Sequence, residues 1–237
     1  MTFSIKADAD DDGLFDGIEL TGSNPTNPDD ADSDDDVLKD GTEDANHNGA
    51  FDTGETNPND PDTDDAVLTD GCEVLGSNPT NPLVTDTDGD GLTDSQEDAN
   101  HNCAREATET DPNNPDSDAD GLNDGIEVTY GTDPLDADSD DDGIPDGQDP
   151  QFIQNAVNAL DVSLFNSAGN KTAFLSALVD IDKLVGAGKI DQAKNKIDLL
   201  RAHVDGCGAT ADGTDWIVDC PTQVTIRGLL DLLKSNL

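Results

Sequence analysis

Acidic side chains recur at every second position at the start of DADDDGLFDGIE, which covers residues 8–19. Ca²⁺ is bound in such loops by side-chain oxygens at positions 1, 3 and 5, a backbone carbonyl at 7, a group at 9 and a carboxylate at 12, with a glycine at 6 for the sharp bend. The stretch supplies each of these in turn, from Asp8, Asp10, Asp12, the carbonyl of Leu14, Asp16 and Glu19. We therefore expect a calcium loop here.

The same twelve-residue frame starts again at Asp32, Asp44, Asp62, Asp86, Asp98, Asp116 and Asp138. Successive starts are 24, 12, 18, 24, 12, 18 and 22 residues apart, so a unit of 54 residues repeats. The text between the loops repeats as well, because ELTGSNPTNP at 19–28 returns as EVLGSNPTNP at 73–82. Repetition this regular predicts a stacked, nearly one-dimensional architecture rather than a disordered acidic tail.

Four more loops follow the frame closely, with asparagine amide oxygens in place of some carboxylates. Their candidate ligands are Asp44, Asn46, Asn48, Asp52 and Glu55; Asp86, Asp88, Asp90, Asp94 and Glu97; Asp116, Asp118, Asp120, Asp124 and Glu127; and Asp138, Asp140, Asp142, Asp146 and Asp149. The last loop ends in Asp149 where the others have Glu, so we expect its final ligand to offer one oxygen.

Three loops depart from the frame. Val37 and Val67 replace the glycine at position 6 in two of them, and a β-branched residue disfavours a positive φ. The loop with Val67 also has Ala66 at position 5, and Cys103 occupies position 6 of the third. Their candidate ligands are Asp32, Asp34, Asp36, Asp40 and Glu43; Asp62, Asp64, Asp70 and Glu73; and Asp98, Asn100, Asn102, Glu106 and Glu109. Each weak copy is alternatively a degenerate loop held by its neighbours, and we expect about five to eight or more bound ions.

The charge of −44 is concentrated in one part of the chain. Residues 1–150 carry 45 acidic and three basic residues, whereas residues 151–237 carry ten and eight. The first part has too few large apolar residues to offset chain entropy by burial, so bound cations must hold it together. A thin apolar seam is expected from the position 7 residues, which are Leu14, Leu38, Leu68, Leu92, Leu122 and Ile144. Such a charge argues against a nucleic-acid partner.

The repeats resemble thrombospondin type 3 repeats, which are also widespread in bacterial secreted and surface proteins. The matching residues are the D-x-D-x-D-G-[LI]-x-D-G-x-E runs, the Asn-Pro and Asp-Pro turns between them, and DSDDDGIPDGQDP at 138–150. The resemblance covers residues 1–150. It implies an irregular, calcium-stabilised loop solenoid with little regular secondary structure, in which the positions named above bind the ions.

Residues 151–237 predict a small all-α domain of three to four helices. Apolar residues at helical spacing mark KTAFLSALVDIDKLV, KIDQAKNKIDLLRAHV and PTQVTIRGLLDLLKSNL, the last through Val224, Leu230 and Leu233. Residues 151–160 are expected to be a helix or an extended approach. The module resembles a helical C-terminal domain of bacterial surface and secreted proteins, through LVDIDKLVGAGKIDQAKNKI, DGC, DW, Cys220 and Gln223. That resemblance implies a fold rather than a chemistry.

The four cysteines bear on the compartment. Cys207 and Cys220 bracket a short loop, and a disulfide there could stabilise it by roughly 3 kcal/mol. Cys72 and Cys103 lie in neighbouring repeats and are expected to form a second bond, or alternatively to be free thiols or a link to another subunit. The even number of cysteines, with loops suited to millimolar calcium, favours an extracellular or cell-surface location. MTFSIK is not a signal peptide, so we expect a mature or truncated form, and no apolar stretch is long enough to span a membrane.

No catalytic motif of a hydrolase, metalloprotease or phosphate-binding enzyme occurs in the sequence, so we expect no enzyme. His47 and His101 fall at position 4 of their loops and are expected to face solvent. We interpret the chain as an extracellular calcium-binding structural protein, a stalk or the repeating subunit of a fibre. Self-association is expected through TFSIK at 2–6 docking head-to-tail on a neighbour. The alternatives are an adhesin or secreted-enzyme accessory module that binds through the helical domain, a cell-surface partner, and calcium storage.

Overall fold

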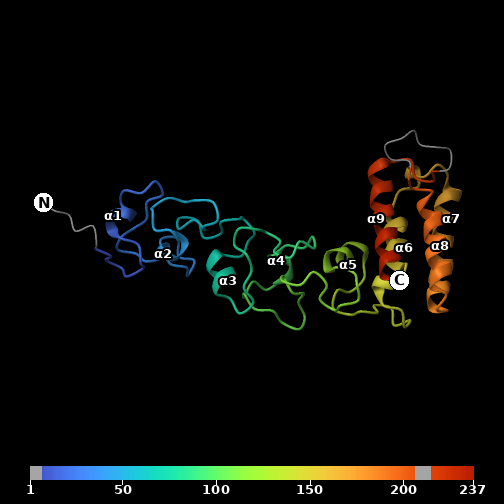
Figure 1. Cartoon of the computed structure of the whole chain (residues 1–237), viewed down its shortest axis with the longest axis horizontal. Coiled ribbons are helices and arrows are strands. Elements are labelled where there is room, and N and C mark those ends of the chain that lie inside the picture. Colours follow the sequence, from blue (N-terminus) through green and yellow to red (C-terminus); the bar gives the residue numbers. More distant parts are fainter. Residues whose placement is uncertain (1–6, 206–214) are drawn as a thin grey trace. The chain divides into compact units, whose positions relative to one another are not determined.

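A computed structural model describes residues 7–205 and 215–237 of the chain. It contains two compact units, Met1–Pro115 and Asp116–Leu237. Among the described residues there is no β-strand, and the one antiparallel bridge joins Phe165 and Ile217. The boundary between the two units therefore comes earlier in the chain than the change in composition at Pro150, because the second unit includes two acidic loops. The labels below are those of Figure 1.

A short helix begins at position 9 in each of six loops. These are α1 (Asp16–Glu19), α2 (Asp40–Glu43), α3 (Asp70–Leu75), α4 (Asp94–Glu97), α5 (Asp124–Tyr130) and the 3₁₀ turn η1 (Asp146–Gln148). In the five α-helical cases the residue before the helix is extended and the first helical residue is an aspartate, a residue type favoured in the first turn by the helix dipole. The regular structure of the loops is therefore limited to single turns or little more.

Two left-handed residues shape each loop, at positions 4 and 6. The residue at position 6 has φ of +105° at Gly13, but also +85° at Val37 and +86° at Val67. Valine was expected to resist this conformation, because its side chain is β-branched. The carboxylate at position 1 holds it instead, because the Val37 amide donates to Asp32 at 2.9 Å and the Val67 amide to Asp62 at 2.8 Å. Such strain costs on the order of 1–3 kcal/mol per residue and persists only where surrounding contacts fix it.

Two pairs of loops in the first unit are joined by a backbone amide and a carboxylate: 32–43 with 8–19, and 62–73 with 32–43. The amide of Gly41 donates to Asp12 Oδ2 at 2.9 Å, and the amide of Gly71 donates to Asp36 Oδ2 at 2.6 Å. A Cβ at Gly71 would lie 2.1 Å from the carbonyl oxygen of Asp36, so only glycine permits this approach. Both glycines stand at position 10 of their loops, which is a structural requirement that the ligand frame does not contain.

The helical head of the second unit consists of α6 (Gln151–Ala159), η2 (Val162–Leu164), α7 (Ala168–Gly186), α8 (Ile190–Arg201) and α9 (Cys220–Asn236). Its core includes Phe152, Phe174 and Leu230, all fully buried. Leu122 and Ile144, from position 7 of the two acidic loops, belong to the same core. Asn236 at the end of α9 donates to the carbonyls of Gly121 at 2.8 Å and Gly147 at 3.0 Å. The last two loops and the head are therefore one folded body.

Two expectations for the head are resolved by the structure. Residues 151–159 form the helix α6 rather than an extended approach. Val224 was expected on the buried face of α9 but is 60% exposed, because the face of α9 that packs inward carries Ile226, Leu229, Leu230 and Leu233. The expected docking segment at residues 2–6 and Cys207 lie outside the described residues, although Cys220 is itself disulfide-bonded.

Candidate calcium sites

The carboxylates at positions 1, 3 and 5 converge in three of the loops. One oxygen of each residue lies within 4.8 Å of the others in the groups Asp8, Asp10, Asp12; Asp32, Asp34, Asp36; and Asp86, Asp88, Asp90. In the first loop the Asp12 carboxylate also accepts from the amide of Leu14 at 2.7 Å. That contact turns the chain sharply and buries Leu14, which is 1% exposed. The loop backbone thus holds positions 1, 3 and 5 together, as a single cation requires.

A buried glutamate closes the cluster at position 12. Glu19, Glu73 and Glu127 are at most 1% exposed. One carboxylate oxygen of each accepts from a threonine hydroxyl, at 3.0 Å in the case of Glu73. The other oxygen, Oε2, is buried and has no hydrogen-bond donor. A buried carboxylate oxygen without a donor is costly, and a cation among the carboxylates would remove that cost.

The electrostatics of these glutamates agree with that interpretation. Burial, followed by repulsion from Asp10 and Asp12, raises the pKa of Glu19 to about 7. Burial and neighbouring aspartates raise the pKa of Glu43 and of Glu127 to about 9. Carboxylates are therefore packed more closely than their mutual repulsion favours. Oxygen-only donors of this charge suit Ca²⁺, and the residues present fit a calcium ion at each such cluster.

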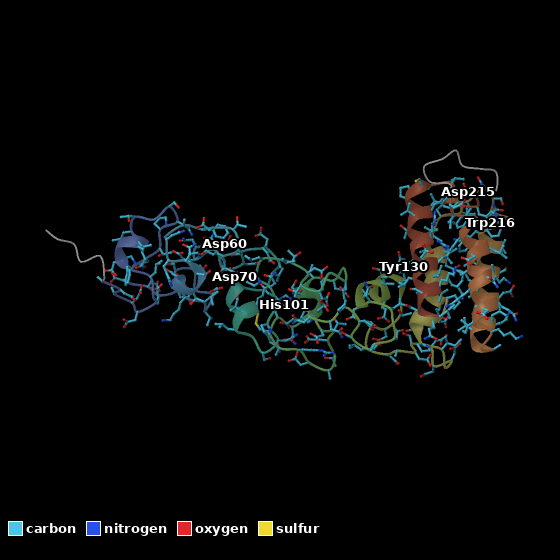
Figure 2. The ribbon with its side chains drawn as sticks, in the orientation of Figure 1. Asp60, Asp70, His101, Tyr130, Asp215 and Trp216 are labelled. Carbon is cyan, nitrogen blue, oxygen red and sulfur yellow. A yellow bond between two sulfur atoms is a disulfide. The ribbon has the colours of Figure 1, made fainter. Side chains whose placement is uncertain are left out.

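The aspartate at position 9 lies against the preceding loop. Asp12, Glu19 and Asp40 are all buried and can bring one oxygen each within 4.8 Å of one another, although Asp40 belongs to the following loop. Within its own loop Asp40 accepts from the amide of Ser33 at 2.8 Å and from its hydroxyl at 2.6 Å. Asp70 (Figure 2) does the same with Thr63 and raises the pKa of Glu43 in an earlier loop. Position 9 thus joins two loops.

Two loops are built differently. In 44–55, the amide nitrogen of Asn46 donates to Glu55 at 2.8 Å and that of Asn48 donates to Asp52 at 2.7 Å. In 98–109, Asn100 and Asn102 donate to Glu106 and Glu109 in the same way. Side-chain amides satisfy carboxylates of both loops. The structure therefore brings the predicted ligands of these two loops together. The loops with aspartate at positions 1, 3 and 5 fit a calcium ion better.

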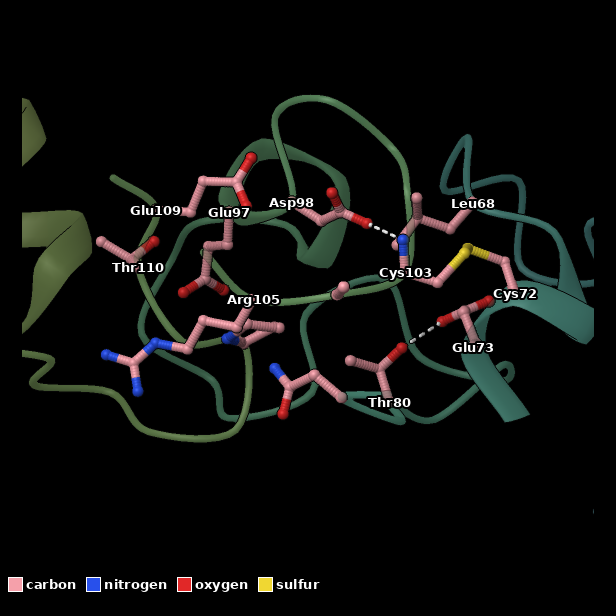
Figure 3. Close-up of a pocket in the computed structure, with 13 residues that line it drawn as sticks. Leu68, Cys72, Glu73, Thr80, Glu97, Asp98, Cys103, Arg105, Glu109 and Thr110 are labelled. Atoms are coloured by element: carbon pink, nitrogen blue, oxygen red, sulfur yellow. Dashed lines mark hydrogen bonds between the residues drawn. A yellow bond between two sulfur atoms is a disulfide. The ribbon is translucent and has the colours of Figure 1, made fainter. Parts of the chain in front are cut away.

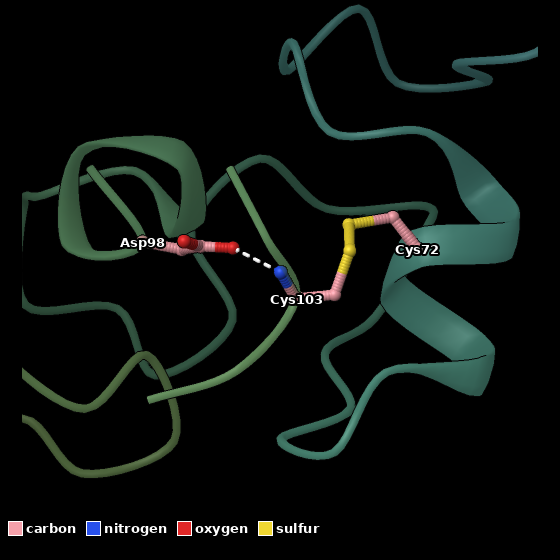
Figure 4. Close-up of side chains that lie close together, drawn as sticks. All are labelled: Cys72, Asp98 and Cys103. Atoms are coloured by element: carbon pink, nitrogen blue, oxygen red, sulfur yellow. Dashed lines mark hydrogen bonds between the residues drawn. A yellow bond between two sulfur atoms is a disulfide. The ribbon is translucent and has the colours of Figure 1, made fainter. Parts of the chain in front are cut away.

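The disulfide lies where the link between loops is absent. One 54-residue repeat after Asp12 and Gly41, the equivalent positions are occupied by Ala66 and Ser95. Both residues of the amide–carboxylate link are therefore replaced in the second repeat. In the same way, Cys72 and Cys103 occupy the positions that are equivalent to Ile18 and Gly49 in the first repeat. These cysteines form a disulfide with Cα atoms 5.4 Å apart (Figure 4). The amide of Cys103 also donates to Asp98 at 2.7 Å, which anchors the bond to position 1 of its loop.

A small pocket lies beside this disulfide (Figure 3). Arg105, one of three basic residues in the acidic part, lines it and pairs with Asp111 at 3.0 Å. Glu73 also lines it and accepts from Thr80 at 3.0 Å. The pocket is thus lined by parts of the loop structure that already have partners.

Two of the histidines are exposed in the acidic loops, whereas the third packs on the tryptophan in the head. His47 and His101 (Figure 2) are exposed, with φ of +55° and +57°, which is the position 4 turn. His203 stacks on Trp216 with ring centroids 3.9 Å apart, a contact that its sequence neighbours did not indicate. Trp216 also meets Phe174 of α7 edge to face at 6.2 Å, so it is fixed in the head.

The glycines at position 10 are functional residues that the ligand frame missed. Gly41, Gly71 and Gly147 each donate a backbone amide to the position 5 aspartate of an earlier loop. The signal was present in the sequence, since glycine recurs at this position, but a frame of ligands alone gives it no role.

Comparisons with known proteins agree with this geometry. The family model for the bacterial TSP3 repeat matches residues 86–101 and 116–137. No curated protein and no solved structure matches the chain.

None of the described helices combines the length and the apolar character needed to cross a membrane. The bacterial TSP3 repeat is an extracellular type of calcium-binding repeat, and the two matched segments carry the Asp-rich loops described above. Residues 86–101 and 116–137 of the chain are therefore repeats of the bacterial TSP3 kind.

Proposed function

We propose that the acidic loops form a calcium-stabilised solenoid and that the protein is an extracellular structural element, a stalk or the repeating subunit of a fibre. The observation that carries the proposal is that Glu19, Glu73 and Glu127 are fully buried and each has an Oε2 atom without a donor. Bound Ca²⁺ supplies the positive charge that makes this arrangement stable.

Each group of residues has its own task in this structure. The aspartates at positions 1, 3 and 5 gather oxygens from one loop, and the glutamate at 12 closes the cluster from the short helix. The aspartate at 9 brings the next loop to the same cluster, as Asp40 does for Asp12 and Glu19. Because an ion is bound by residues of two loops, the free energy of calcium binding contributes to the folding of the array.

A structural role suits the disposition of these carboxylates better than catalysis does. Glu19, Glu43, Glu73, Glu97 and Glu127 at position 12 are buried beside other acidic side chains, so they do not face a substrate. We propose that the protein is no enzyme. Its partners would be further copies of itself, joined head-to-tail, or a component of a cell surface.

The decisive measurement is metal stoichiometry by native mass spectrometry of the full chain. We expect about five to eight or more calcium ions per chain. Removal with EDTA should abolish protease protection in residues 7–115. A chain that binds no calcium, or one that keeps its protease protection in EDTA, would contradict the proposal. Electron microscopy with and without chelator then distinguishes a fibre, which should fall apart on chelation, from a monomeric stalk.

A second function is favoured by a groove in the head. Tyr130, Leu160, Pro221 and Ile226 line a cavity of about 200 Å³ beside α6 and α9. Its apolar walls and threonine hydroxyls could receive a carbohydrate or a peptide side chain, as an adhesin or an enzyme accessory module would require. Glycan and protein arrays probed with the calcium-loaded monomer test this. Binding that Thr225→Trp abolishes would support the head as the binding site, because Thr225 lines the groove and is exposed.

A further inference from the structure

Two buried side chains of the head carry oxygens that have no hydrogen-bond donor among the described residues. Asp215 is 2% exposed and Gln223 is 3% exposed. Both oxygens of the Asp215 carboxylate lack a donor, and so does Gln223 Oε1. Within the described part of the helical head, these three atoms are the only buried side-chain oxygens without a donor. A buried carboxylate without a partner is costly, so a positive charge must offset it.

The side-chain amides beside these oxygens are already used by the backbone. Asn166 Nδ2 donates to the backbone carbonyl of Asp215, not to its carboxylate. Gln223 Nε2 donates to the carbonyl of Ile217 at 2.5 Å, which places the amide group of Gln223 against the segment that carries Asp215. Ile217 is itself fully buried. The segment is therefore fixed in the head, and what remains unmatched on it is a set of acceptors.

Carboxylate and amide oxygens are the ligands that a hard cation such as Ca²⁺ prefers. A proton on the Asp215 carboxyl group would serve at most one further acceptor, whereas a cation can bind all three oxygens. We propose that Asp215 and Gln223 bind a Ca²⁺-type cation in the head, at a site outside the acidic loops. Asp215 supplies the negative charge and up to two oxygens, Gln223 supplies a neutral oxygen, and water completes the coordination. The ion would join the segment before α9 to the first turn of that helix.

The proposed site lies at the end of α9 that is remote from the acidic loops. Gln223 is in the first turn of α9, whereas Asn236 at its last turn donates to carbonyls of two acidic loops. The helix has 17 residues and is therefore about 25 Å long. Trp216, the only tryptophan, directly follows Asp215 (Figure 2). Its fluorescence can therefore report on a cation at Asp215 separately from ions in the loops.

The test measures terbium luminescence of three full-length proteins. Tb³⁺ enters oxygen-only calcium sites, and a tryptophan excites its emission only when the two are close together. Excitation of Trp216 should produce terbium emission in the wild type, and Asp215→Asn should weaken the binding behind it on the order of tenfold or more. Asp191→Asn removes the same charge from an exposed residue of α8 and serves as the control, which should keep the wild-type emission.

Thermal unfolding monitored by Trp216 separates cation binding from a purely structural role of the carboxylate. In EDTA, Asp215→Asn should unfold at a higher temperature than the wild type, because it removes a buried charge without a partner. In saturating calcium the order should reverse, because only the wild type gains the bound ion. Equal terbium emission from the wild type and Asp215→Asn, or a less stable Asp215→Asn protein in both media, would overturn the proposal.

The outcome for the head is distinguishable from the outcome for the acidic loops. Native mass spectrometry that counts a single calcium ion per chain, together with terbium emission excited through Trp216, would refute the calcium-filled solenoid and leave the site at Asp215 standing. Many bound ions without such emission would support the solenoid and refute the site in the head.

Discussion

The disulfide and the amide–carboxylate link should be interchangeable, and this can be tested quantitatively. Cys72→Ser with Cys103→Ser removes a cross-link between residues separated by 31 positions. Chain-entropy reasoning gives a loss of about 4 kcal/mol for a loop of this size. Introducing Ala66→Asp with Ser95→Gly into this background recreates the pair seen at Asp12 and Gly41. A hydrogen bond to a charged group contributes roughly 1.5–3 kcal/mol, so about half of the loss should return.

Hydrogen exchange by mass spectrometry is the suitable assay, because the first unit contains no tryptophan or tyrosine. In saturating calcium, loss of the disulfide should speed exchange in peptides from residues 62–109 by roughly a thousandfold. Restoring the link should recover roughly 10- to 100-fold of this. Peptides from residues 168–201 in the head serve as the internal control and should not change.

Calcium makes the test discriminating. The carboxylate that Ala66→Asp introduces would join Glu73 and Asp94, as Asp12 joins Glu19 and Asp40. With calcium present the added carboxylate is a ligand, whereas in EDTA it adds one more like charge and should speed exchange further. Unchanged exchange after loss of the disulfide, or a rescue of equal size in EDTA, would refute the reasoning.

Three further outcomes are expected. Ile18→Cys with Gly49→Cys should form a disulfide in the first repeat, detectable as a loss of free thiol, because Ile18 Cγ2 would lie 2.9 Å from a Cβ at Gly49; two persisting thiols would contradict the repeat equivalence. The pKa of Glu43 and of Glu127 is raised to about 9 in the fold, above the unfolded value of about 4.3. Protonation of these glutamates therefore stabilises the calcium-free fold fully below a pH of about 4, and this stability is lost as the pH rises through about 9. EDTA-treated protein should resist protease better at a pH of about 5 than at a pH of about 9, and the reverse order would exclude this mechanism. Asn236→Ala removes two hydrogen bonds to loop carbonyls and should lower the head's stability by roughly 1–3 kcal/mol in Trp216-monitored denaturation, whereas Ser235→Ala should have little effect.

The period and the composition of the loops were enough to predict where carboxylates gather. The alternation of Asp8, Asp10 and Asp12 and the terminal Glu19 are local features, and the structure brings the three aspartates together and buries the glutamate. The helices of the head followed from apolar spacing for the same reason. The disulfide between Cys72 and Cys103, which was the expected pairing, is present.

Contacts between loops were not predictable from the frame. Position 9 was assigned to the ion of its own loop, yet Asp40 lies with the buried residues of the loop before it. Val37 tolerates a left-handed backbone because Asp32 accepts its amide, which is a contact made only in the folded loop. Val224 fits a helical pattern as well as Ile226 does, and only the packing of α9 determines which of the two is buried.

The sharing of Asp40 between two loops has a consequence for how ions would be taken up. A loop that has already bound its ion positions a ligand for its neighbour, so occupancy should spread from one loop to the next in the manner of a nearest-neighbour chain. Uptake would then be steep in calcium concentration. At the corresponding place one repeat later, Ala66 replaces Asp12, so the cluster keeps Glu73 and Asp94 but lacks one carboxylate. That spread should weaken there, which would divide the first unit into two cooperative blocks joined covalently by the bond between Cys72 and Cys103.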